Sequence, residues 1–80
     1  MDDAALQEAL MEAHGRGDHL ALVQLYTEAA DRNEALGEID AACFFLTHAF
    51  VFALEQAAPE AMALNKRLAD HGRAEPMSSI

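Results

Sequence analysis

Four histidines are the side chains in this sequence best suited to chemistry: His14, His19, His48 and His71. Imidazole nitrogens bind metal ions and exchange protons near neutral pH. Two ligands on one helical turn require an i, i+4 spacing, which no pair of these histidines has, and the sequence contains no HExxH motif. Histidines close to helix ends usually act as caps or face solvent. We therefore expect no metal site.

Covalent catalysis has no better support. Arg16 lies between Gly15 and Gly17, but a P-loop requires a lysine and a hydroxyl residue after the second glycine, and a preceding strand. Cys43 is the only cysteine, so it can form neither an intramolecular disulfide nor a CxxC site. Both serines lie near the C-terminus, and no nucleophile, base and acid form a recognisable set. The sequence predicts no catalytic residues and no cofactor, and we expect no enzymatic activity.

His48 is the only ionisable group within a strongly apolar run. Residues 41–54 contain one other polar residue, a threonine, together with all four phenylalanines of the chain. A buried histidine that is hydrogen-bonded to a neighbour is the simpler interpretation. The alternative places His48 in a groove beside Phe45 and Phe52, where its ring would bond the backbone of a partner.

The apolar run predicts a central helix from Ile39 to Ala57. It is too long for a strand, contains no glycine or proline, and is too short to span a bilayer. Turn-forming residues divide the remaining sequence into three further helices. Gly15 is expected to end the first helix in the left-handed conformation, Asp18 to cap the second and Pro59 to begin the fourth. The other three helices are expected to end near His14, Leu36 and His71.

These helices predict an all-α fold, with four antiparallel helices in two αα-hairpins. The hairpins are expected to form one domain, residues 1–72, followed by a disordered C-terminal tail, residues 73–80. A 52 % apolar share indicates a folded chain rather than a disordered one.

Helical periodicity assigns faces to the central helix. Taking 100° per residue, Leu46 and Phe50 lie at the centre of a broad apolar face and are predicted to be fully buried. Phe45 and Phe52 are two turns apart on the opposite face, where they need cover from a neighbouring helix, a partner or a second copy of the chain. In the fourth helix, the pair Lys66–Arg67 is expected to face solvent.

Net charge restricts the class of partner. The formal charge of −9 argues against nucleic acid and anionic membranes. Residues 1–55 carry eleven acids and two arginines, whereas residues 56–80 are balanced. A basic or amphipathic partner is therefore expected to bind the first two-thirds, unless the acids only keep an apolar chain in solution. The start of the sequence has no export signal, so a cytoplasmic location is expected.

Residues 3–36 resemble a tetratricopeptide repeat, a helix-turn-helix unit of about 34 residues. The residues that carry the resemblance are Leu6, Leu10, Ala13, Gly17, Asp18, Leu22, Tyr26 and Ala29. The segment from Tyr26 to Asp31 is also similar to the related Sel-type repeat. The resemblance implies a protein-binding superhelix with a concave groove, which is lined by the first helix of each pair.

The second hairpin departs from the repeat pattern. Aligning Ala58-Pro59 with Gly17-Asp18 gives a spacing of 41 residues, tryptophan is absent, and Glu34 replaces the closing proline. Whether it is a true repeat is open at this point.

A protein–protein interaction module, as an adaptor or accessory subunit that binds a protein or peptide, is the function these features favour. The predicted acidic-rimmed groove is lined by Gln7, Met11, His14, Phe45, His48 and Phe52. Two alternatives remain: a structural homo-oligomer, such as a homodimer, that buries its phenylalanine face against itself, and a helical bundle that binds a small molecule or metal through His14, His48 and the Met11 side.

Overall fold

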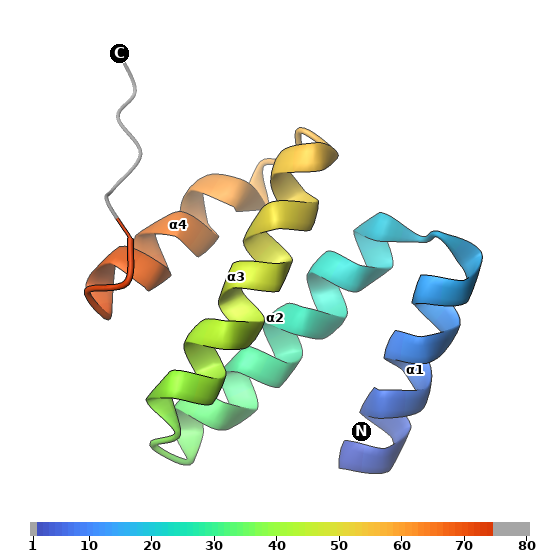
Figure 1. The fold of residues 1–80 in the computed structure, drawn as a ribbon, viewed down its shortest axis with the longest axis horizontal. Helices are drawn as coiled ribbons and strands as arrows, with labels where there is room; N and C mark the ends of the chain where they lie inside the picture. Colours follow the sequence, from blue (N-terminus) through green and yellow to red (C-terminus); the bar gives the residue numbers. More distant parts are fainter. Residues whose placement is uncertain (1, 75–80) are drawn as a thin grey trace.

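Four α-helices follow one another along the chain in a computed structural model that describes residues 2–74 (Figure 1). Within that range there is no strand, so the all-α prediction is confirmed. The bounds are α1 Asp3–Arg16, α2 His19–Ala35, α3 Ile39–Glu55 and α4 Glu60–Asp70. α3 crosses in front of α2, and α1 and α4 lie on opposite sides of this central pair. The molecule is flat, with extents of 38 × 29 × 14 Å.

Two aspartates cap the first two helices, as their positions predict. The carboxylate of Asp2 accepts a hydrogen bond from a first-turn N–H of α1 at 2.7 Å, and Asp18 does the same for α2 at 3.1 Å. The predicted end of the first helix at Gly15 is wrong, because α1 continues to Arg16 and Gly17 is the left-handed residue, with φ of 65°. Gly17 alone directs the chain so that the next residue can cap α2.

A left-handed residue follows every helix, and one of the four is not a glycine. These residues are Gly17, Gly37, Ala57 and Gly72. Ala57, with φ of 51°, is the only non-glycine residue with a positive φ among residues 2–74. The N–H of Ala58 then donates to the Ala53 carbonyl at 2.8 Å, which closes the end of α3 before Pro59. α3 therefore ends at Glu55, two residues before the predicted end.

The main core lies between α2, α3 and α4 and includes Leu46, which is fully buried as predicted. The prediction for Phe50 is wrong, because this ring is only half-buried at the margin of the core. The buried face of α3 is centred instead on its small residues Ala42, Ala49 and Ala53. Small side chains let α2 approach α3 closely, and this packing rotates the larger ring of Phe50 toward the edge.

A second, smaller core joins α1 to α2 through Leu6, Leu10 and Leu22. Backbones approach one another only between consecutive helices: no Cα atom of α1 comes within 8 Å of α3. The contacts between α1 and α3 are made by side chains alone. The predicted corner before the fourth helix is present, because α3 and α4 are separate helices that pack together.

Charged side chains tie the second hairpin to α2. Lys66 is exposed as predicted, but Arg67 is not fully solvated, because its guanidinium pairs with Asp31 at 2.7 Å and with Glu34 at 2.5 Å. The predicted tail begins at Arg73, yet this arginine pairs with an aspartate at the start of α3 and the next residue packs against the core. The rest of the predicted tail, 75–80, lies outside the described residues.

Candidate functional site

The outer face of α3 carries an exposed apolar surface. Phe44 is 57 % exposed, Val51 45 % and Leu54 47 %, although the other faces of this helix are covered by α2 and α4. Phe44 and Val51 are seven residues apart, which is two helical turns on one side. We call Phe44, Thr47, His48, Val51, Leu54 and Glu55 the α3 surface.

A shallow hollow of about 210 Å³ lies within the α3 surface. It is lined by Thr47, His48, Val51, Phe52 and Glu55. Glu55 stands at the C-terminal end of α3, and the last turn of this helix contains no basic residue. The carboxylate therefore adds its charge to the partial negative charge of the helix end. This end of the α3 surface is electronegative.

His48 supplies the polar group of the α3 surface. Its Nδ1–H donates to the Phe44 carbonyl at 3.0 Å, and its ring lies 4.5 Å from the Phe44 ring and 5.0 Å from the Tyr26 ring. Because a carbonyl only accepts, this bond places the proton on Nδ1. Nε2 of the neutral ring is left as an acceptor, and no group among residues 2–74 bonds to it.

Tyr26 joins the α3 surface to α1. Its hydroxyl and His14 Nε2 are hydrogen-bonded at 2.9 Å, and its ring stacks on Phe52 with centroids 6.0 Å apart. It also stacks on Phe45 at 6.2 Å. Burial raises the pKa of the Tyr26 phenol above its ordinary value. The sequence placed Tyr26 on an apolar helix face; its hydroxyl, the only phenolic group in the chain, was the signal for a polar contact.

Four of the six groove residues predicted from the sequence have rings close to Tyr26: His14, Phe45, His48 and Phe52. His14 contacts the Phe52 ring at 6.0 Å, and His48 and Phe52 line the same hollow. Gln7 and Phe45 line a second hollow between α1, α2 and α3. Met11, on α1, is 72 % exposed.

The sequence left open whether a neighbouring helix, a partner or a second copy of the chain covers Phe45 and Phe52. Phe45 and Phe52 are half-buried and pack against both cores, so the neighbouring helices already supply their cover. The side chains of α3 that no neighbouring helix covers are those of Phe44, Val51 and Leu54. Helical periodicity did not single out these three side chains, because it could not show which sides α2 and α4 occupy.

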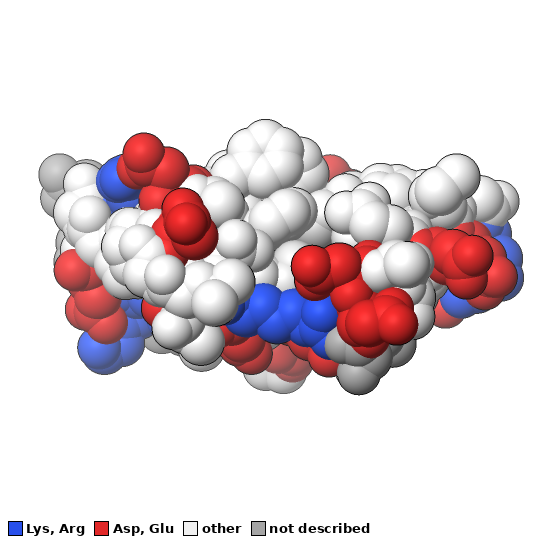
Figure 2. Space-filling view, turned by 90° about the horizontal axis from the view of Figure 1, so that it is seen from below, with Lys and Arg blue, Asp and Glu red and all other residues white. Residues whose placement is uncertain are grey.

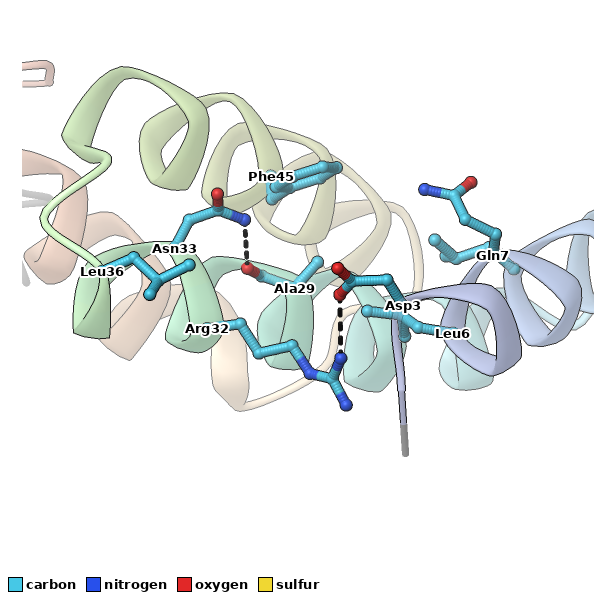
Figure 3. A pocket seen from close by; sticks show the side chains of 9 residues that line it. Asp3, Leu6, Gln7, Ala29, Arg32, Asn33, Leu36 and Phe45 are labelled. Carbon is cyan, nitrogen blue, oxygen red and sulfur yellow. Dashed lines mark hydrogen bonds and ion pairs between the residues drawn. The ribbon is translucent and has the colours of Figure 1, made fainter.

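The second hollow, of about 250 Å³, is shown in Figure 3. An ion pair of 3.0 Å between Asp3 and Arg32 joins α1 to α2 along one side of it. The Asn33 amide donates to the Ala29 carbonyl at 2.8 Å, and the Phe45 ring lies above them. The arginine is thus satisfied within the chain, and the predicted groove is not purely acidic at this end.

Every lysine and arginine of the chain is paired with a carboxylate. The five are Arg16, Arg32, Lys66, Arg67 and Arg73. Figure 2 shows the result on one face, where blue atoms lie beside red ones and most of the surface is uncharged. The charge that is not balanced internally is therefore carboxylate, Glu55 among it.

Among residues 2–74 no three histidine, cysteine, aspartate or glutamate side chains converge as the ligands of a metal ion. Within the same range, every helix is too short or too polar to cross a bilayer.

Comparisons of the chain with protein-family models, with curated proteins and with solved structures give no significant match. The tetratricopeptide and Sel-type resemblance of residues 3–36 therefore stays a prediction.

Proposed function

We propose that this protein is a protein–protein interaction module that binds its partner through the α3 surface and the adjoining groove. The observation that carries the proposal is the exposure of Phe44, Val51 and Leu54 along one side of a helix whose other faces pack against α2 and α4. Contiguous apolar side chains of this kind mark interaction sites on small proteins.

The chemistry of the surface suits recognition. Phe44 offers an aromatic anchor, the hollow beside Val51 can receive a side chain, and His48 Nε2 can accept one hydrogen bond. The hollow is present in the free chain, and Phe52 in its lining stacks on Tyr26. A partner would thus meet a preformed site, which lowers the entropic cost of binding.

Self-association is the second use of such a surface. Two copies would bring together chains of formal charge −9, and neither has a lysine or arginine without an internal carboxylate partner. Like charge opposes that association, especially at low ionic strength. A foreign partner is therefore the use that we propose.

Site-specific photo-crosslinking in the native host tests this function. p-Benzoylphenylalanine is placed at Val51, and at Met62 as a matched control, because Met62 is similarly exposed (56 %) but lies on α4. We expect a discrete adduct with another protein from position 51 and none from position 62. An adduct of twice the chain mass would indicate self-association. Absence of any adduct at position 51 would contradict the proposal.

A further inference from the structure

We propose that the occupant of the α3 surface is a cationic amphipathic helix of the partner protein. This inference rests on the proposed function and adds the chemical class of the binding segment. It is drawn from the shape of the surface, its hydrogen-bonding capacity and the charge around it.

The shape of the α3 surface matches a helix. Phe44 to Leu54 spans about 15 Å at a rise of 1.5 Å per residue, so the surface is a straight ridge of about three turns. Ridges of this kind pack against the grooves of a second helix. The hollow of about 210 Å³ between His48, Val51 and Phe52 has room for one apolar side chain from that helix.

Hydrogen-bonding capacity favours a helix over an extended segment. An extended peptide must satisfy its own N–H and C=O groups, and it normally does so by joining the edge of a sheet. Residues 2–74 contain no strand whose edge an extended peptide could join, and the acceptors that the α3 surface offers are side-chain atoms such as His48 Nε2 and the Glu55 carboxylate. A helix satisfies its backbone internally and needs only side-chain contacts.

The charge around the α3 surface calls for a cationic segment. Glu55 lies at the negative end of the α3 dipole with no basic residue in the last turn, and it lines the hollow. The five lysines and arginines of the chain are already engaged with other carboxylates. A lysine or arginine supplied by the partner would therefore meet both Glu55 and the helix end.

Two synthetic helical peptides distinguish this inference from its alternatives. They share one leucine face long enough to cover α3, and their polar face carries either lysine or glutamate. Binding of each labelled peptide to the full chain is measured by fluorescence anisotropy. We expect the lysine peptide to bind and the glutamate peptide to show no binding. Equal binding of the two peptides, or a preference for glutamate, would overturn the inference.

Matched variants locate the site. The double variant Phe44→Ser with Val51→Ser should raise the Kd of the lysine peptide by roughly tenfold or more. Leu20→Ser with Met62→Ser removes two similarly exposed apolar side chains elsewhere and should leave Kd unchanged. Glu55→Gln should weaken binding several-fold, whereas Glu8→Gln, which makes the same change in net charge on the solvent side of α1, should not. Equal effects within either pair would show non-specific attraction and overturn the inference.

Two controls test whether the variants stay folded and whether the surface binds a second copy of the chain. Circular dichroism and thermal melting of each variant must match the parent chain, as expected for exposed positions. The mass of the free chain is measured over a range of concentrations, and a dimer that dissociates on Phe44→Ser would assign the surface to a second copy. If position 51 crosslinks to a foreign protein but the lysine peptide fails to bind, the inference is wrong and the proposed function stands.

Discussion

Tyr26 is the residue at which three helices meet. From α2 it reaches His14 on α1 through its hydroxyl, and Phe45 and Phe52 on α3 through its ring. Because the backbones of α1 and α3 do not touch, this side chain carries much of the connection between them. Its contribution can be separated into a polar and an apolar part.

Tyr26→Phe should remove the polar part alone. We expect a loss of about 0.5–1.5 kcal/mol at pH 7, because one partly exposed hydrogen bond is removed and the ring stays. Burial raises the pKa of Tyr26, so the folded state favours the neutral phenol and its stabilisation is lost as pH rises above 10. Denaturant unfolding at pH 7 and above pH 10 checks this: the difference between parent and variant should shrink at high pH. A difference independent of pH would contradict it.

Glu34 is the corresponding residue between α2 and α4. Its carboxylate accepts from His71 Nε2 at 2.7 Å and from Arg67 at 2.5 Å. The hydrogen bond from His71, then that from Arg67, lowers the pKa of Glu34 against the opposing effect of burial. The ionised form is therefore stabilised in the folded state.

Glu34→Gln should cost about 1 kcal/mol at neutral pH. Since the folded pKa lies below the unfolded value, the contribution is present above about pH 4.5 and disappears as pH falls through the folded pKa. Urea unfolding of parent and variant from pH 7 to pH 3 measures it, with Glu8→Gln as the unpaired control. If the two variants lose stability equally at every pH, the α2–α4 ion pairs contribute nothing.

At the scale of the element, α3 has two kinds of aromatic position. Phe45 and Phe52 pack against both cores, whereas Phe44 is exposed beside Val51. The difference arises from neighbouring helices and not from hydrophobicity, since all three rings are identical. It leads to opposite expectations for substitutions only one residue apart.

Phe45→Ser with Phe52→Ser should unfold much of the protein, at about 2 kcal/mol or more for each ring. Phe44→Ser with Val51→Ser should change the unfolding free energy by less than about 0.5 kcal/mol per site. Thermal melts of both double variants, with Leu46→Ala as a destabilised reference at about 2–5 kcal/mol, decide between the two. Similar melts for the two double variants would contradict this division of the helix.

The turn from α3 to α4 contains a strained residue. Ala57 adopts the left-handed conformation that three glycines adopt after the other helices. An alanine pays about 1–2 kcal/mol there because its Cβ approaches the following carbonyl.

Ala57→Gly should raise stability by about 0.5–1 kcal/mol, the relief of strain being partly offset by the greater entropy of glycine in the unfolded chain. Gly17→Ala should do the reverse, because the Cβ would be added to a residue with φ of 65°. Chemical denaturation of both variants is the measurement. A destabilised Ala57→Gly would show that this turn is not under strain.

At the scale of the whole molecule, sequence reasoning succeeded where the signal was local. Asp18 has a capping side chain, and Pro59 a fixed φ, so the number and order of the helices were predictable. The rotation of α3 about its axis was not predictable, because it depends on how closely α2 approaches. In the structure Ala49 is fully buried and Phe50 only half-buried. Arg67 was assigned to solvent since its partners, Asp31 and Glu34, lie on another helix and are more than 30 residues away in sequence. Which face of α3 stays open is likewise a property of the assembled helices.

In this fold, backbones contact one another only between consecutive helices. We therefore expect cooperativity to pass from each helix to its neighbour along the chain. α2 and α3 share the most extensive interface, and the backbone of each outer helix approaches only one neighbouring helix. Amide hydrogen exchange should therefore be slowest in α2 and α3, and α1 should exchange through local openings that cost less than global unfolding. Such an opening would uncover the Tyr26 and Phe52 rings. The apolar area available to a partner would then extend from α3 across α2. Local opening of α1 would therefore change the size of the binding surface.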